Sequence, residues 1–341
     1  MRDRGIEIGE GSADGPPRAE VLKRSVNVVS TANLREATLG ADIEMTQLRS
    51  GEQHGRLAHV AIDQVALSLC RFGIEVRARG VLDVERAVLG VVLSSSREAL
   101  FWGEAAQPGD VVTFPPGIEA DAVYKSALSY AAISVDPQEV VPLFAHDGAL
   151  GDPDTWLSAR VRHTEPLLGV ELRRRLIGLS VSLRRYGDTA SAQSIDFARR
   201  SIIEAFGAAV ASGASGERSP AQRSAARIVR DVEEYVDAAA DRPVHLSEIC
   251  TALQISRRSL HRAFANTLGL GPVAYLRRRR LSLIEAILRR SDARSVKIAQ
   301  LAFEYGFPEP SRFTSYYRAL FGVTPSHTRR RRFEPTGFGT N

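Results

Sequence analysis

The spacing of apolar residues changes near the middle of this chain. Between residues 58 and 135, short apolar stretches alternate with turn residues, such as Pro-Gly-Asp at 108–110 and Pro-Pro-Gly at 115–117. This texture is typical of strands joined by tight turns, and many short strands favour a β-sandwich or a β-barrel. The predicted strands cover 58–69, 74–82, 87–93, 111–114, 122–124 and 129–135.

From residue 166 onward the apolar residues recur at helical spacing instead. Two amphipathic helices are predicted over 166–185 and 191–211, separated by Gly187 and Asp188, and together they form a helical hairpin. The following segment, 211–220, is rich in Gly, Ser and Ala and is the clearest linker in the chain. Every apolar pattern beyond it is helical.

Two segments of this last part share one arrangement of paired short helices. In the first, 246–264, apolar residues at i, i+3, i+4 and i+7 from Leu246 predict a helix, which Gln254 and Ile255 end in a tight turn. Ser256 suits the N-cap of the next helix. That second helix turns four polar side chains outward, namely Arg257, Arg258, His261 and Arg262.

The second segment, 296–321, repeats the arrangement with different residues. Gly306 ends its first helix, Phe307 fills the turn, and Pro310 suits the first turn of the next helix. Its outward side chains are Ser311, Arg312, Thr314, Ser315 and Tyr316. Between the two segments, 272–290 predicts a helix of about 17 residues, or about 25 Å. Such a rod could hold two small bundles nearly one turn of DNA apart, about 34 Å.

The charges divide along the same boundary. The net charge of +5 is the sum of a basic part, 221–341, with 21 Lys and Arg against 11 Asp and Glu, and an acidic part, 1–220, with 24 against 29. The basic part has a net charge of +10 and the acidic part −5, an asymmetry that suggests a nucleic-acid-binding half attached to something else. We expect the acidic part to be repelled by DNA.

Residues 223–332 resemble the AraC/XylS family of bacterial transcription regulators. The motif that carries the resemblance runs from Ile298-Ala299 through Ala302 and Gly306-Phe307 to Ser311, Phe313, Tyr317 and the run Phe321-Gly322-Val323-Thr324-Pro325. The sequence departs from the family pattern at Gln254, where a glycine is common, and at Pro308, where a serine-like cap is frequent. The second departure leaves the start of the second recognition helix open.

The resemblance implies which residues contact DNA. Arginine side chains in the two outward faces suit the guanine edge, whereas cationic runs at 277–280 and 329–332 suit phosphates. Which arginines read bases and which meet phosphates stays open, and a solvated helix face is an equal alternative for 277–280. The candidate DNA-binding residues are Arg257, Arg258, His261, Arg262, Ser311, Arg312, Thr314, Ser315, Arg277 and Arg278.

For the acidic part, the resemblance implies a cupin-like β-barrel that binds a small effector or mediates dimerisation. Its interior could be lined by aromatic residues, although each of them is also an ordinary core residue: Phe72, Phe101, Trp102, Phe114 and Tyr124. The fold predicted is multidomain α+β, with this barrel and its helical hairpin preceding an all-α domain of two helix-turn-helix motifs. The predicted parts are a disordered leader 1–20, a sensor domain 21–160, a hairpin 161–211, a linker 212–222, a DNA-binding domain 223–334 and a tail 335–341.

The acidic part contains no sequence motif typical of catalysis or of metal binding. Its histidines, His54, His59, His146 and His163, form no close pair with a following Glu, and no zinc, phosphate-loop or nucleophile-elbow pattern occurs. We therefore predict no catalytic residue, metal or cofactor, and leave the effector-binding residues unassigned. Two cysteines, no signal-like N-terminus and no long apolar run predict a cytoplasmic protein without a membrane anchor.

These observations leave three hypotheses. The first is a sequence-specific DNA-binding transcription regulator that responds to a small molecule. It would bind duplex promoter DNA, with RNA polymerase as a partner if it activates, and would lie on the nucleoid when bound, as a monomer or a homodimer. The second is a cupin-type small-molecule-binding protein or enzyme with an accessory helical domain. The third is a non-specific DNA-associated protein that uses its arginine runs alone.

Overall fold

The structure, a computed structural model, describes residues 21–28, 41–51, 54–62, 65–215, 220–239, 244–289 and 296–330. The predicted leader 1–20, the predicted tail 335–341 and part of the predicted linker lie outside these residues. Among the described residues, no helix combines the length and the apolar character that a membrane span requires.

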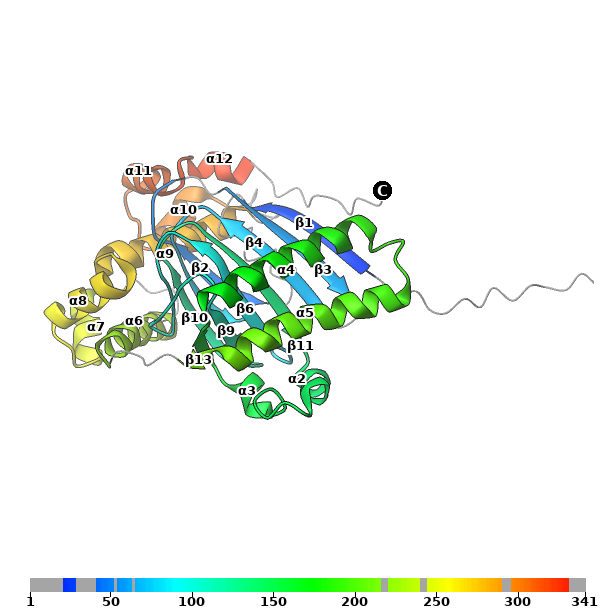
Figure 1. The fold of residues 1–341 in the computed structure, drawn as a ribbon. Coiled ribbons are helices and arrows are strands. Elements are labelled where there is room, and N and C mark those ends of the chain that lie inside the picture. Colours follow the sequence, from blue (N-terminus) through cyan, green and yellow to red (C-terminus); the bar gives the residue numbers. More distant parts are fainter. Residues whose placement is uncertain are drawn as a thin grey trace, which may run out of the picture.

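The strands form two antiparallel sheets rather than one closed barrel, and this is how the predicted β-rich part is built (Figure 1). The larger sheet has the order β1 (Val21–Val28), β3 (Gly55–Ile62), β4 (Val65–Phe72), β11 (Leu128–Val135), β6 (Ala87–Ser95), β9 (Val111–Phe114), β12 (Arg160–His163) and β13 (Ala214–Ser215). The smaller sheet has the order β2 (Asp42–Gln47), β5 (Val76–Val81), β10 (Glu119–Tyr124), β7 (Ala99–Phe101) and β8 (Glu104–Ala106).

One predicted strand is two strands in the structure. The stretch 58–69 was expected to be continuous, but β3 and β4 pair as a hairpin whose ladder runs from Gly55 opposite Phe72 to Ile62 opposite Val65. The apolar pattern continues through both strands because both lie in one buried sheet, and it therefore conceals the turn. Strands β1, β2, β7, β8, β12 and β13 were not predicted.

The predicted helical hairpin is present as α4 (Pro166–Tyr186) and α5 (Ala192–Ser212). Figure 1 shows both helices lying across one face of the larger sheet. Leu176, Ile202 and Phe206 are fully buried there against strand residues such as Leu89. Smaller helices connect the sheet to the hairpin: α2 (Pro137–Val140), the 3-10 helix η1 (Val141–Phe144) and α3 (Pro153–Leu157).

The C-terminal part is helical throughout, as predicted. Its helices are α6 (Pro220–Ala238), α7 (Leu246–Ala252), α8 (Arg257–Leu268), α9 (Pro272–Arg289), α10 (Ile298–Glu304), α11 (Pro310–Phe321) and α12 (Pro325–Arg330). They surround two separate cores. One contains Phe264 and Tyr275, and the other contains Phe313 and Tyr317.

The two parts of the chain lie in direct contact. The first helical core also contains Leu48, Leu100 and Val123, which belong to the smaller sheet or the residues beside it. The turn at Gly103 fits against α6 so closely that a Cβ there would come within 2.8 Å of the Ala226 Cβ. The Gly/Ser-rich segment therefore does not hold the acidic part away from the helical part.

Candidate nucleic-acid interface

The first helix-turn-helix unit is built as its sequence predicts. Helix α7 ends in a turn closed by a hydrogen bond from the Ile255 N–H to the Cys250 carbonyl, at 3.0 Å. Gln254 adopts a φ of +53° in this turn, the left-handed conformation that glycine adopts most readily. Ser256 caps α8, because its hydroxyl oxygen accepts a hydrogen bond from the Ser259 N–H at 3.0 Å.

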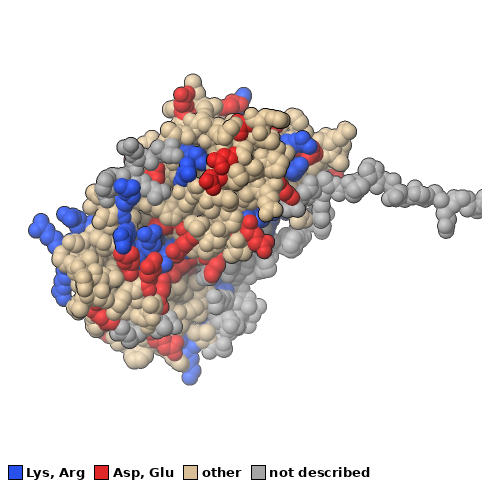
Figure 2. All heavy atoms as spheres, turned by 90° about the horizontal axis from the view of Figure 1, so that it is seen from below, with Lys and Arg blue, Asp and Glu red and all other residues tan. Residues whose placement is uncertain are grey.

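Helix α8 has one buried face and one exposed face. Leu260 and Phe264 are fully buried, whereas the four predicted contact residues are exposed: Arg257, Arg258, His261 and Arg262. Seen from below, Lys and Arg side chains project from the left-hand end of the molecule, the end at which α8 lies (Figure 2). The first recognition helix thus presents a cationic face to solvent.

The second unit has a glycine at the equivalent turn. Gly306 has a φ of +77°, and the Phe307 N–H donates to the Ala302 carbonyl at 2.8 Å. Helix α11 begins at Pro310, so Pro308 lies outside it, and Glu309 occupies the N-cap position without a side-chain capping bond. This places the start of the second recognition helix, which the sequence left open.

The exposed face of α11 is less cationic, and its polar groups are partly engaged. The four candidates Ser311, Arg312, Thr314 and Ser315 are exposed. The Thr314 hydroxyl donates to the Pro310 carbonyl at 2.9 Å and the Ser315 hydroxyl to the Ser311 carbonyl at 3.0 Å. The Arg312 guanidinium donates to the Tyr316 hydroxyl at 3.0 Å and pairs with Glu309.

The four consecutive arginines 277–280 of α9 have four different environments. Arg277 lies over the Tyr316 ring, 4.3 Å from its centroid. Arg278 is half-buried, and this burial lowers its pKa. Arg280 donates to the Tyr305 carbonyl at 3.2 Å and lies over the Phe307 ring. Arg279 is buried and held by carboxylates. The prediction that all four arginines 277–280 face DNA phosphates is therefore wrong for Arg279.

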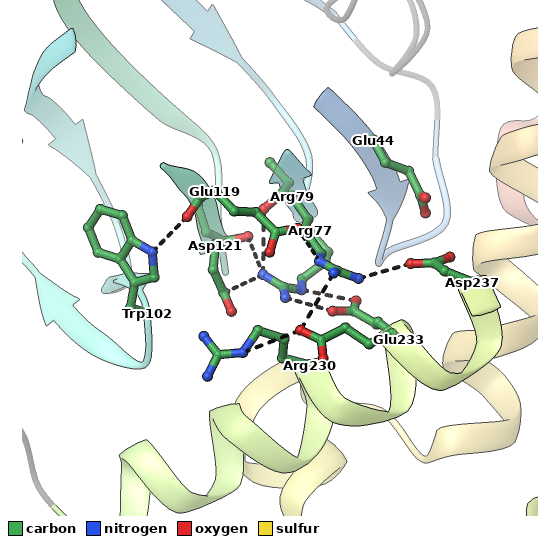
Figure 3. Close-up of polar contacts among 12 residues, drawn as sticks. Glu44, Arg77, Arg79, Trp102, Glu119, Asp121, Arg230, Glu233 and Asp237 are labelled. Carbon is green, nitrogen blue, oxygen red and sulfur yellow. Dashed lines mark hydrogen bonds and ion pairs between the residues drawn. The ribbon is translucent and has the colours of Figure 1, made fainter. Parts of the chain in front are cut away.

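A buried charge cluster between the smaller sheet and the helical part was not predicted (Figure 3). The Arg77 guanidinium of β5 contacts Asp121 of β10 and forms two bonds to Glu233 of α6, at 2.8 and 3.2 Å. The Tyr275 hydroxyl of α9 also donates to Glu233. Burial by itself would raise the pKa of Glu233, but Arg77, the Tyr275 hydroxyl and Arg279 together outweigh burial and lower this pKa.

The cluster continues to Arg279. Its guanidinium forks onto the Glu44 carboxylate of β2 at 2.5 and 2.6 Å and also reaches Asp237 of α6 at 2.5 Å. Asp237 in turn accepts from Arg79 of β5 at 3.0 Å. Arg77 and Arg79 alternate with apolar residues in β5, which is the signal that a polar layer covers this face of the sheet.

A cavity of about 340 Å³ lies between the two sheets. Four of the five aromatic residues expected in the interior line it, Phe72, Phe101, Phe114 and Tyr124, whereas Trp102 does not. Trp102 lies in the turn after β7, and its indole N–H donates to the Glu119 carbonyl of β10.

Several polar groups of the cavity wall bond to one another. The His59 ring contacts the Ser68 hydroxyl at 2.7 Å, and Arg86 donates to the Ser134 hydroxyl at 2.9 Å. Within the described residues, no group of three His, Cys, Asp or Glu side chains is arranged to hold a metal ion. The wall therefore suits an organic molecule with a large apolar part.

Comparison with known proteins identifies the helical part. A family model of a helix-turn-helix domain matches residues 249–331. The XylDLEGF operon transcriptional activator 1 of Pseudomonas putida is 24% identical over 291 residues, which cover 83% of this chain and 84% of that protein. The HTH-type transcriptional regulator GlxA of Rhizobium meliloti (strain 1021) is 32% identical over 139 residues, 40% of this chain and 42% of its own.

Among solved structures, the AraC-like transcriptional activator CuxR overlaps 76% of this chain and 94% of its own, with 15% identity and a TM-score of 0.41. The residues described above and the family match define the C-terminal domain as a DNA-binding domain of two helix-turn-helix units. The chain is a transcription regulator of the AraC/XylS type.

Proposed function

We propose that α8 and α11 enter two successive major grooves of duplex promoter DNA. The observation that carries this proposal is the pair of helix-turn-helix units with exposed polar faces, joined by the 18-residue helix α9. At 1.5 Å per residue α9 is about 27 Å long, close to the separation of successive grooves on one face of DNA. The helical part would then read DNA over about one turn.

Exposure divides the candidate residues by role. Arg257, Arg258, His261 and Arg262 of α8 are the principal base-reading candidates, because they project from the most cationic exposed helix. On α11 the candidates are Arg312 with Ser311, Thr314 and Ser315. Arg277 and Arg278 of α9 are assigned to phosphates, which position the protein without reading sequence.

The acidic part supplies the regulation in this proposal. The cavity between the sheets, lined mostly by apolar and aromatic side chains, is the site for a small organic effector. An effector that fits one conformation better than another would shift the population of DNA-binding molecules. The chain itself would catalyse no reaction and would work in the cytoplasm, on the nucleoid when DNA is bound.

Helix α4 offers a surface for a homodimer. Leu167, Val170, Ile177 and Val181 form an exposed apolar stripe on it, and Gly178 beside them has open space where a side chain would lie. Burying such a stripe against a second copy would remove apolar area from water. The P. putida relatives are named activators, and RNA polymerase is the partner an activator would need.

The test is a DNA-binding titration of the full chain on its own promoter and on random DNA. Sequence-specific regulation predicts an affinity that falls steeply with salt and a discrimination of about 10³ or more between promoter and random DNA. Arg257→Ala should weaken promoter binding by about 1–3 kcal/mol and relax preference at particular bases, and Arg312→Ala should do the same to a smaller extent. Arg277→Ala should weaken binding to both DNAs and reduce the salt slope by about one.

Arg200→Ala is the matched control, because Arg200 is an exposed arginine on α5 that pairs locally with Asp196. It should leave both affinities unchanged. Equal affinity of the wild type for promoter and random DNA would favour the non-specific DNA-binding alternative. Turnover of a small molecule by the full chain, abolished by substitutions in the cavity wall, would favour the enzyme alternative.

A further inference from the structure

Tyr316 of α11 contacts two arginines that the proposed function assigns to DNA. Arg277 of α9 lies over the Tyr316 ring, with its guanidinium carbon 4.3 Å from the ring centroid. Arg312 lies four residues before Tyr316 in α11, and its Nε donates to the Tyr316 hydroxyl at 3.0 Å. The tyrosine is half-buried and packs on the core of the second unit. One anchored ring therefore links a candidate for phosphate contact to a candidate for base contact.

The orientation of Arg312 matters because other hydroxyl donors of this face are already engaged. The Thr314 and Ser315 hydroxyls donate to carbonyls of their own helix, so neither has a hydrogen to offer a base while these bonds last. Arg312 is an exposed cation on the same helix. A long side chain that is already held in place loses less conformational entropy on binding than one that rotates freely.

The contacts of Arg312 leave the end of its guanidinium available. Tyr316 holds Nε, and Nη1 pairs with Glu309 at 3.5 Å, in a pair whose two side chains are each 63% exposed. Exposed ion pairs are weak, so a guanine edge can replace Glu309. Guanine O6 and N7 require two N–H groups side by side, and the two Nη atoms supply them. The bond to Tyr316 does not have to break when a base binds.

We propose that Tyr316 is a positioning residue for base recognition by α11. Its hydroxyl holds the guanidinium of Arg312 by Nε, so that the two Nη groups face the base. Its ring attracts the guanidinium of Arg277 by a cation–π contact and so couples the phosphate contact of α9 to the base contact of α11. This inference rests on the proposed function, since it concerns how α11 selects its base.

The experiment separates the hydroxyl from the ring in the full chain. Tyr316→Phe removes the hydroxyl and keeps the ring, whereas Tyr316→Leu removes both and keeps an apolar side chain on the core. Tyr235→Phe is the matched control, because Tyr235 is a half-buried tyrosine of α6 whose hydroxyl donates to Glu248 at 3.0 Å. Each variant is titrated with promoter DNA, with its single-base variants and with random DNA, at several salt concentrations.

The two substitutions should differ in what they lose. Tyr316→Phe should lower the preference for the base that Arg312 reads by about fivefold, the value of one net hydrogen bond, with unchanged binding to random DNA and an unchanged salt slope. Tyr316→Leu should lose the same preference, bind random DNA more weakly and have a smaller salt slope, because Arg277 is released as well. Tyr235→Phe should change neither the base preference nor the salt slope.

Two further measurements test whether Tyr316 acts through Arg312. In the Arg312→Ala background, Tyr316→Phe should cause no further loss of base preference, since the group it positions is gone. In NMR spectra recorded without DNA, the Arg312 Nε–H signal should shift and exchange faster with water in Tyr316→Phe, and it should stay unchanged in Tyr235→Phe.

Equal weakening on all DNAs by Tyr316→Phe would overturn the proposal, because a residue with only a packing role has that effect. Additive losses in the double variant, or an unchanged Arg312 Nε–H signal, would overturn it as well. Tyr316→Phe keeps the packed ring, so it decides the proposal even where Tyr316→Leu fails to fold. If Arg312→Ala changes no base preference, base reading by α11 fails instead, and the NMR signal still reports whether Tyr316 holds Arg312.

Discussion

The two helix-turn-helix units have the same arrangement of helices but form it with different residues. The first has Gln254 in a left-handed turn, a serine cap and an exposed cationic helix, and its core merges with the smaller sheet. The second has Gly306 in its turn, no side-chain cap, fewer cations, and a core of its own. The comparison indicates that the first unit is tied to the acidic part through packing, whereas the second is tied mainly through a few polar contacts.

Replacing the central aromatic residue of each core by alanine should give the largest difference between the two units. Phe264→Ala and Phe313→Ala should each destabilise the fold by about 3–5 kcal/mol, because both side chains are almost fully buried. Phe264→Ala should also speed hydrogen exchange in β7 and β10, whose Leu100 and Val123 share its core. Phe313→Ala should spare those strands, and a loss of protection there equal to that of Phe264→Ala would contradict the division into two cores.

The two turns should respond differently to substitution. Gly306→Ala forces a Cβ into a φ of +77° and should cost about 1–2 kcal/mol. Gln254→Gly relieves the same strain but adds freedom to the unfolded chain, so its net effect should be within about 0.5 kcal/mol or stabilising. Urea unfolding measures both. Gly148→Ala is the control, since its Cβ would meet nothing within 4 Å, and it should be nearly neutral.

The smallest difference concerns the helix caps. Ser256→Ala removes the oxygen that accepts from the Ser259 N–H and should destabilise the first unit by about 1 kcal/mol. Ser311→Ala, in the first turn of α11, removes no cap and should change stability by less than about 0.5 kcal/mol. Thermal unfolding of the two variants decides the matter, and equal losses would mean that Ser256 acts other than as a cap.

Most of the helical part could be predicted because its signals are local. Helix spacing, the cap at Ser256, the glycine at Gly306 and the outward face of α8 each depend on residues within a few positions of one another. The strands were harder to predict from the sequence. The turn between β3 and β4 is hidden inside a continuous apolar pattern, and β7 and β8 have three residues each, too few to show a period.

The arginine run of α9 marks the limit of local reasoning. Residues 277–280 look alike in sequence, yet Arg279 is buried between two carboxylates while Arg277 lies on an aromatic ring. Their difference depends on Glu44, which is 235 positions away along the chain. No periodicity within the helix contains that information.

The sequence by itself determined that two helix-turn-helix units end this chain, since amphipathic spacing, caps and turn residues act over one or two helical turns. It also determined the opposite charges of the two halves. Only the tertiary structure decided that these halves dock rather than stand apart. Docking depends on ion pairs such as Arg77 with Glu233, between residues 156 positions apart, and on a sheet whose inner face lines a cavity. Contacts of such separation are set by packing, which no local pattern records.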